Sequence, residues 1–268
     1  MKDNGKQNIV GVLIDGVDYD GAVRRIISAA LEERPYSVSA LAVHGVMTGV
    51  GNAEHRYRLN HLDLVTPDGQ PVKWALNLLH KTGLSDRVYG PTLMLKVCAE
   101  AARRGLPIYA YGSSQIVLTH LSRRLEERFP GLVVAGAEPS KFRTTSPQEK
   151  QEIAARIRSS GAKVTFVGLG CPRQETFAHE YRDALGMPVI AVGAAFDYHA
   201  GHMEEPPMWI QRRGLQWLHR LVQDPARLWR RYLLLNPAYL TLLTLQALGL
   251  WRPDPNRVVR PPSEVLYG

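Results

Sequence analysis

The sequence predicts an α/β protein with a mostly parallel sheet, helices on both faces of the sheet and a helical C-terminal appendage. Short apolar runs alternate with amphipathic stretches over the first 205 residues, which is typical of parallel strands joined by crossover helices. The composition then changes, because nine arginines and only three acidic residues lie within residues 206–268. We therefore expect a globular domain at 1–205 and a basic, amphipathic appendage at 206–268.

The local hydrophobic pattern predicts each element of the globular domain. Strands are expected at 9–14, 38–43, 62–65, 107–111, 133–137, 164–168 and 188–192. Helices are expected at 20–33, from Pro71 onward, and at 92–104, 114–128, 147–159 and 174–184. In the helix at 114–128, Ile116, Leu121 and Leu125 recur near helical spacing, with charged residues between them.

Charge and cysteine content limit the partners and the compartment. The net charge of +8 and the pI of about 9.6 favour an anionic partner such as phosphate, nucleic acid or a lipid surface. Cys98 and Cys171 have neither CxxC nor zinc-site spacing, and no secretory signal is visible at the N-terminus. Both cysteines are therefore expected to be reduced, ordinarily packed thiols of a cytosolic protein.

Four strand-to-helix junctions are candidate ligand sites, because open parallel sheets bind ligands beyond the carboxyl ends of their strands. The first junction places Asp68 on a Pro-Asp-Gly turn before the helix that starts near Pro71. Asp68 can cap that helix, or it can act as a general base held rigidly at the sheet edge. The second junction holds Gly112 and two serines, which together can form a phosphate cradle.

The third junction, GLGCPRQE, begins like a dinucleotide fingerprint, but Arg173 stands where the third glycine would be. An NAD site is therefore disfavoured. Gly170 still allows close backbone approach, and Gln174 can both donate to and accept from a base or a sugar. At the fourth junction, Gly193 lets a ligand come close, and Asp197 is a second candidate carboxylate or a partner for an arginine.

Several motifs occur together in the order expected of one family. They are LVTPDGQPVKW, which contains Asp68, then Arg87-Val88-Tyr89-Gly90, Phe129-Pro130-Gly131, GLGCPRQE, VGAAFDYHAG and GLQWLHRLVQDPARLWRRY, which ends at Tyr232. From about residue 38 to residue 232 the chain resembles bacterial glycosyltransferases of the WecG/TagA/CpsF type, glycosyltransferase family 26. The pairing of GxGxPRQE with the arginine-rich tail is highly specific.

The resemblance implies a Rossmann-like fold and a transferase reaction. A sugar would move from a UDP-sugar to a saccharide on a polyprenyl diphosphate, with inversion at the anomeric carbon and without a metal or other cofactor. Asp68 would be the general base. The donor would be bound by Arg87, Gly90, Gly112, Gly170, Gln174, Gly193 and Asp197.

The resemblance also implies that the appendage closes over the site at the inner face of the cell membrane. Arg220, Arg227 and Arg230 would bind the diphosphate or lipid, since arginines must stabilise the departing UDP where no metal does. Their spacing of seven and three residues would place them on one face of a continuous helix. The body is expected to self-associate, as a homo-oligomer, and to be inactive until the appendage docks.

Residues 233–251 carry no charge, but polar residues and Pro237 interrupt the apolar run. A bilayer span needs about 20 predominantly apolar residues. We therefore expect an interfacial helix on anionic lipid, with a packed core helix, a dimer contact or a bilayer span as the alternatives. Residues 253–268 are expected to form a loose tail.

The chain departs from the family pattern at three places. His44 stands where an asparagine of a Thr-x-Asn signature often lies, and it can contact the sugar or phosphate, assist Asp68, or be structural. Gly90-Pro91-Thr92 replaces Gly-x-Asp, and the loop at 138–143 replaces a Gly-Tyr-Phe pattern.

The donor sugar is left open among N-acetylmannosamine, its uronic acid and glucose. TPDGQPVKW with His44 favours the exopolysaccharide branch, which includes the xanthan-type glucosyltransferase.

Two other functions are alternatives to the predicted glycosyltransferase. A soluble nucleotide-dependent dehydrogenase predicts NAD binding, against which the missing third glycine argues. A nucleic-acid-binding protein would explain the pI and predicts an affinity that falls steeply with salt. The basic residues alternate with apolar ones such as Leu215, Trp217 and Leu218, which suits lipid or a protein groove better than a duplex. We therefore expect no nucleic-acid partner.

Overall fold

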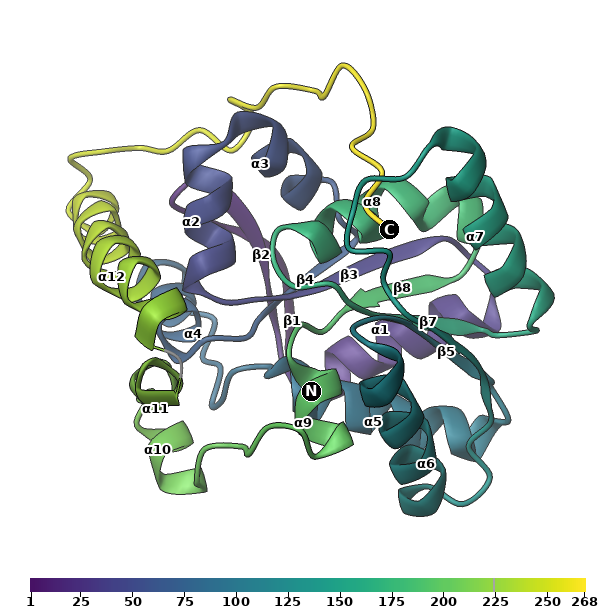
Figure 1. Cartoon of the computed structure of the whole chain (residues 1–268). Helices are drawn as coiled ribbons and strands as arrows, with labels where there is room; N and C mark the ends of the chain where they lie inside the picture. Colours follow the sequence, from purple (N-terminus) through teal and green to yellow (C-terminus); the bar gives the residue numbers. More distant parts are fainter. Residues whose placement is uncertain (224) are drawn as a thin grey trace.

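A six-stranded parallel sheet lies at the centre of the molecule, with helices on both faces (Figure 1). The computed structural model describes residues 1–223 and 225–268, and the side chains of all these residues except Met208, Arg212, Arg220, Gln223, Arg227, Arg230 and Arg231. The strand order is β4-β3-β8-β7-β5-β6. The strands are β3 (Tyr36–Leu41), β4 (Leu64–Pro67), β5 (Ile108–Gly112), β6 (Val134–Glu138), β7 (Val164–Gly168) and β8 (Pro188–Ala191). The predicted α/β fold class is confirmed.

The strand predicted at 9–14 is wrong. This region is a separate antiparallel hairpin of β1 (Asp3–Ile9) and β2 (Val12–Val17). Val10 and Gly11 form the turn, with φ of 47° and 95°. The run reads as one strand because Ile9, Val10, Val12 and Ile14 are all fully buried, so the apolar pattern continues through the turn.

The helices predicted within the first 205 residues are all present, with boundaries shifted by at most two residues. They are α1 (Tyr19–Leu31), α4 (Gln70–His80), α5 (Gly90–Arg104), α6 (Gln115–Arg128), α7 (Pro147–Ser159) and α8 (Arg173–Leu185). The short helices α2 (Val43–Gly51), α3 (Ala53–Asn60) and α9 (Ala195–Ala200) were not predicted. In α6 the buried face holds Val117, Leu118, Leu121 and Leu125, whereas Ile116 is 64% exposed.

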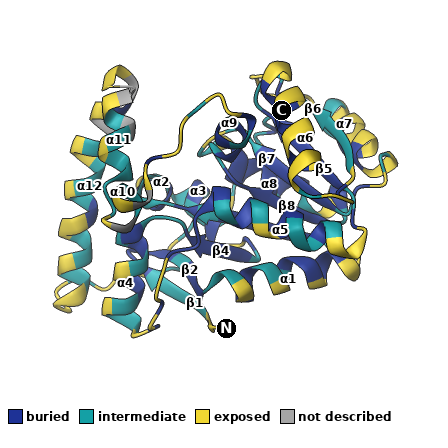
Figure 2. Ribbon diagram, turned by 90° about the horizontal axis from the view of Figure 1, so that it is seen from below, coloured by how far each residue is buried: buried dark blue, intermediate teal, exposed yellow. Residues whose placement is uncertain are grey.

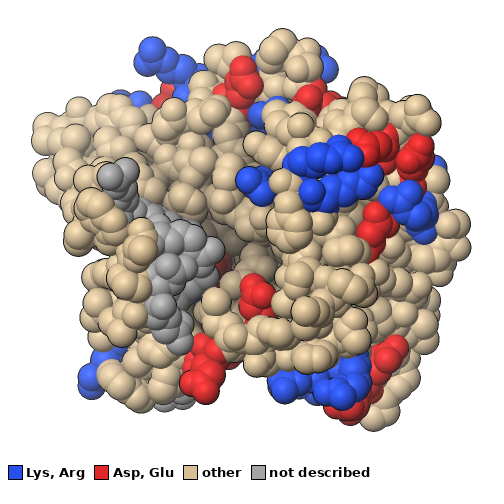
Figure 3. Space-filling view, in the orientation of Figure 1, with Lys and Arg blue, Asp and Glu red and all other residues tan. Residues whose placement is uncertain are grey.

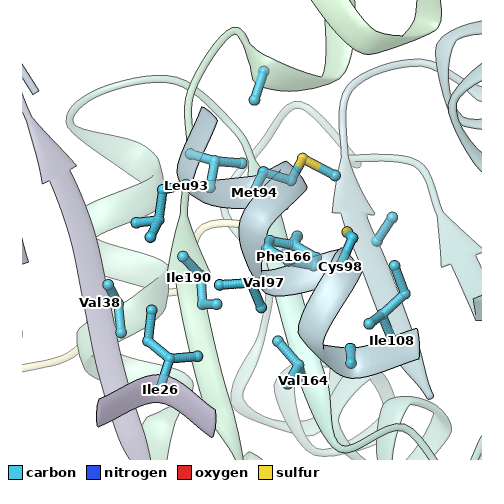
Figure 4. Packing of buried hydrophobic residues seen from close by; sticks show 14 of the residues in the cluster. Ile26, Val38, Leu93, Met94, Val97, Cys98, Ile108, Val164, Phe166 and Ile190 are labelled. Atoms are coloured by element: carbon cyan, nitrogen blue, oxygen red, sulfur yellow. The ribbon is translucent and has the colours of Figure 1, made fainter. Parts of the chain in front are cut away.

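Two apolar layers enclose the sheet. On one face α1, α5 and α6 pack on the strands, and Figure 4 shows Val97 and Cys98 of α5 close to Phe166 of β7 and Ile190 of β8. On the other face α2, α3, α7 and α8 cover the sheet, and the rings of Phe177 and Tyr181 stack at 3.8 Å. Burial is concentrated between these layers (Figure 2). The core therefore holds the strand ends in fixed relative positions.

The C-terminal segment forms α10 (Met208–Arg212), α11 (Gln216–Gln223) and α12 (Pro225–Ala247), and α12 packs against α2 and α4. The rings of Trp217 and Tyr232 lie 5.7 Å apart. Fifteen residues of one continuous helix would separate them by about 22 Å. The prediction of one continuous helix is therefore wrong, because α11 and α12 fold back on each other. Among the described residues, no helix is both long enough and apolar enough to cross a membrane.

The prediction of a loose tail at 253–268 is also wrong. The tail runs back across the body and is held by backbone hydrogen bonds at several points. Asn60 Nδ2 donates to the Pro255 carbonyl at 2.9 Å, and the amide of Thr145 donates to the Leu266 carbonyl at 2.7 Å. Glu180 accepts from the amides of Val265 and Leu266 at 3.0 and 2.9 Å.

Glu180 also forms a buried ion pair with Arg58, at 3.0 Å. We expect Glu180→Ala to lower the free energy of unfolding by about 3–5 kcal/mol, because it leaves the Arg58 guanidinium buried and unpaired. Hydrogen exchange at Val265 and Leu266 should rise at the same time. Glu127→Ala is the matched control, since Glu127 pairs with Arg123 on an exposed helix face and should contribute about 0–1 kcal/mol.

Denaturant unfolding of the two variants gives the comparison. Equal losses in Glu180→Ala and Glu127→Ala would contradict the assignment of Glu180 as the anchor of the tail.

Candidate functional site

A cavity of about 790 Å³ opens beyond the carboxyl ends of four adjacent strands, β4, β3, β8 and β7. Residues that follow these strands form one wall, and much of the rest is formed by α4, α11, α12 and the segment around Arg87. Figure 3 shows the hollow in this face. Three of the four predicted junctions therefore converge here.

Asp68 lies on the cavity wall at the end of β4. Its amide donates to the Leu41 carbonyl at 3.1 Å, which fixes the turn to the end of β3. The amide of Gly90 donates to Asp68 Oδ1 at 2.9 Å. Pro71 lies in the first turn of α4, so the sequence after Asp68 is also rigid. Asp68 does not cap α4, because the N-cap residue is Gly69 and no side chain makes that cap hydrogen bond.

Arg87 is only 6% exposed and connects this turn to the C-terminal segment. One amino group of its guanidinium donates to the Asp68 carbonyl at 3.2 Å and to the side-chain oxygen of Gln216. The other donates to Gln211 Oε1 at 3.3 Å. The guanidinium also lies over the ring of Tyr89, 4.3 Å from its centroid. Arg87 and Arg213 are the two arginines among the described residues that line the cavity.

Tyr89 is a buried hydroxyl beside Asp68. Burial raises its pKa above the ordinary value, and the negative charge of nearby carboxylates, among them Asp68, raises it further. The phenol therefore keeps its proton at neutral pH and can donate a hydrogen bond into the cavity.

The turn after β7 contributes Gly170, Cys171, Gln174 and Glu175 to the cavity. Gln174 Nε2 donates to Glu175 Oε1 at 2.9 Å. Burial raises the pKa of Glu175, and hydrogen bonds from Gln174, Cys171 and Ser39 only partly offset this. Gln174 Oε1 is buried without a hydrogen-bond partner, so it is available to accept from a ligand.

His44 and Gly193 also line the cavity, at the ends of β3 and β8. Three other predicted donor residues do not. Gly90 acts through its amide on Asp68, and Asp197 lies in α9 outside the lining. Gly112 lies where β5 and β7 approach, since a Cβ there would come within 2.8 Å of the Gly168 backbone. This close approach explains the glycine without a ligand.

Arg220 falls in α11, and Arg227 and Arg230 fall in α12. Their side chains lie outside the described residues, so their predicted binding of diphosphate or lipid stays a prediction.

Sequence reasoning missed several lining residues, which are Tyr89, Glu175, Gln216, Tyr232 and Tyr239. Tyr89 and Glu175 lie in the motifs Arg87-Val88-Tyr89-Gly90 and GLGCPRQE, from which other residues were predicted as ligand contacts. Tyr239 is 1% exposed and donates to the Pro71 carbonyl at 3.3 Å. In the sequence, Tyr239 is a polar group within an otherwise apolar run, and this is the feature that could have indicated that α12 packs on the body.

The fold and the cavity define an α/β protein that binds its ligand beyond the carboxyl edge of a parallel sheet. A profile of the glycosyl transferase WecG/TagA/CpsF family matches residues 7–253. The chain belongs to this family, as the motifs predicted. It is similar to the N-acetylglucosaminyldiphosphoundecaprenol N-acetyl-beta-D-mannosaminyltransferase of Bacillus spizizenii, with 31% identity over 191 residues, 71% of each chain.

We expect Arg87→Ala to loosen α10 and α11. Hydrogen bonds to a charged group contribute about 1.5–3 kcal/mol, so amide exchange in residues 209–219 should rise by about tenfold or more relative to β5 and β7. Arg213→Ala is the matched control, because Arg213 is exposed and contacts only the Trp209 ring among the interactions described, at 5.8 Å. Unchanged exchange in Arg87→Ala would show that Arg87 does not hold this segment.

Proposed function

We propose that the protein is an inverting glycosyltransferase that moves a sugar from a UDP-sugar to a saccharide carried on a polyprenyl diphosphate, in the synthesis of a bacterial surface polysaccharide or exopolysaccharide. The observation that carries the proposal is Asp68, a carboxylate held rigidly at the wall of a large cavity in a chain of this family.

Inverting transfer is a single displacement and needs one base. In the proposed step the Asp68 carboxylate takes the proton of the acceptor hydroxyl, and that oxygen forms a bond to the anomeric carbon. The bond between the anomeric carbon and the β-phosphate oxygen breaks, and UDP leaves with the electron pair. The hydrogen bond from the Gly90 amide supports this role because it fixes the direction of the carboxylate.

The leaving diphosphate must be stabilised by positive charge and hydrogen-bond donors. Arg87 and Arg213 line the cavity, and the Tyr89 hydroxyl is a protonated donor beside them. We assign Gln174, Gly170 and Gly193 to the donor nucleotide or sugar. Arg220, Arg227 and Arg230 complete the positive charge in this proposal.

The relative from Bacillus spizizenii supports the acceptor class, because its name specifies an N-acetylglucosaminyldiphosphoundecaprenol and an N-acetylmannosaminyl group. At 31% identity the donor sugar of this chain can differ. N-acetylmannosamine, its uronic acid and glucose are the three candidates. His44, at the cavity wall, supports assignment to the exopolysaccharide branch.

A lipid-linked acceptor must reach the cavity from a membrane surface. The cavity wall formed by α12 is continuous with exposed leucines on the same helix, Leu233, Leu234 and Leu240. Trp209 and Trp229 are exposed nearby in the same segment. We propose that this apolar surface lies on the anionic inner face of the cell membrane, beside the arginine-rich stretch. Self-association of the body is part of the same proposal.

The first experiment is sugar transfer from a panel of UDP-sugars to polyprenyl-diphosphate saccharides in detergent. We expect one donor to be used, and Asp68→Asn to lower kcat by about 10²–10⁴-fold because it removes the base. Asp86→Asn is the matched control, since Asp86 accepts from Gln70 at 3.1 Å but does not line the cavity. If Asp68→Asn retains activity within about tenfold of the wild type, His44 becomes the candidate base.

Membrane association can be measured separately by flotation with anionic vesicles. We expect the double variant Leu233→Glu, Leu234→Glu to reduce partitioning by about tenfold or more, because burying one leucine contributes about 1.5–3 kcal/mol. Leu31→Glu is the control, since Leu31 is an exposed leucine on α1. Equal flotation of the two variants would place the membrane contact elsewhere on the molecule.

A further inference from the structure

Three potential metal ligands from distant parts of the chain meet beside the cavity. His55 comes from α3, and Cys171 and Glu175 come from the turn and first residues of α8. One ligand atom of each residue lies within 4.8 Å of the others. The catalytic proposal for Asp68 uses none of these groups.

Two members of the cluster are buried and have polar atoms without partners. His55 is 4% exposed and Glu175 is 1% exposed. His55 Nε2 and Glu175 Oε2 make no hydrogen bond to the described residues. Glu175 Oε1, in contrast, accepts from Gln174 at 2.9 Å and from Ser39 at 3.3 Å. The Cys171 thiol also interacts with this carboxylate, so two members of the cluster are already in contact, while the buried Oε2 makes no hydrogen bond to the described residues, which is rare for a buried polar atom.

We propose that His55, Cys171 and Glu175 bind a zinc ion. Imidazole, thiolate and carboxylate together are a ligand set that suits Zn²⁺. A tetrahedral ion with ligands at about 2.0–2.3 Å needs neighbouring ligand atoms about 3.3–3.8 Å apart, which small side-chain adjustments within the observed 4.8 Å can provide.

The charges of the cluster balance with a divalent ion. A thiolate and a carboxylate neutralise Zn²⁺, and the neutral imidazole adds no charge, so the occupied site is neutral overall. Arg58, on the same helix as His55, is paired with Glu180 at 3.0 Å, which partly offsets its positive charge near the cluster.

The proposed zinc site can be reached from the cavity, and a bound ion would affect the cavity wall. Cys171 and Glu175 both line the cavity, so an ion can reach them from it, and three protein ligands leave one position open to water. A bound ion would tie α3 to the β7–α8 turn, on which Gln174 and Gly170 lie. Its role is therefore to position this turn, which is compatible with metal-free transfer at Asp68.

The test measures metal directly and uses the whole chain. Metal-free protein is titrated with Zn²⁺ in competition with a chromogenic chelator, and with Co²⁺ for its thiolate charge-transfer absorption. We expect one ion per chain with about micromolar affinity or tighter. Cys171→Ser should abolish the cobalt–thiolate absorption, and both Cys171→Ser and His55→Gln should weaken zinc binding by roughly a hundredfold or more.

Two variants serve as matched controls. Cys98→Ser removes the other cysteine, which lies in the core on α5, and His179→Gln removes a histidine on α8 that is not in the cluster. Both should bind zinc as the wild type does, with folding of every variant checked by circular dichroism.

Absence of zinc binding at about micromolar concentration in the wild type would overturn the proposal and leave a bridging water at the cluster. Zinc binding that survives in Cys171→Ser would overturn it as well, since the ion would then lie elsewhere. Because the readout is metal binding, its failure leaves the transferase proposal untouched.

Discussion

The Arg87 guanidinium is the contact on which the arrangement of the site depends. It is buried, it reaches the Asp68 carbonyl, and it is the point at which two glutamine side chains of the C-terminal segment meet the body. A buried guanidinium without such acceptors would be strongly unfavourable. The same charge therefore holds the turn that carries Asp68, attaches α10 and α11 to the body, and supplies one of the cations facing the cavity.

Much of this arrangement follows from the sequence. The alternating pattern predicts the six parallel strands, and because parallel strands end at one edge, the turns after β3, β4, β7 and β8 must converge. Asp68, Gln174 and Gly193 were predicted from these turns, whereas Arg87 was predicted from the family motif that contains it. The pattern fails where burial is complete on both sides of a turn, as at Val10, and where helices are as short as α9. It also fails for Gly112, whose glycine is required by the nearby Gly168 backbone.

The zinc cluster shows a different limit of sequence reasoning. Metal sites are recognised in a sequence when their ligands are closely spaced, as in CxxC motifs. Here the histidine precedes the other two ligands by more than a hundred residues, and only the packing of α3 against α8 brings them together. Cys171 accordingly looked like an ordinary packed thiol. The signal that distinguishes this cluster is the pair of buried polar atoms without partners on His55 and Glu175, which no sequence pattern reports.

The tail that Glu180 holds has a mechanical consequence. The segment that covers the cavity is joined to the body through the chain after α9, and its far side is fastened again where Val265 and Leu266 meet α8. A segment attached to the body at one end can rotate away from it, whereas a segment attached at both ends has much less freedom to move. The chain after α12 is also held closer to that helix, where the Pro253 and Pro255 carbonyls accept from the side chains of Asn8 and Asn60. Loss of the Glu180 contacts alone would therefore leave the cavity wall formed by α12 attached to the body.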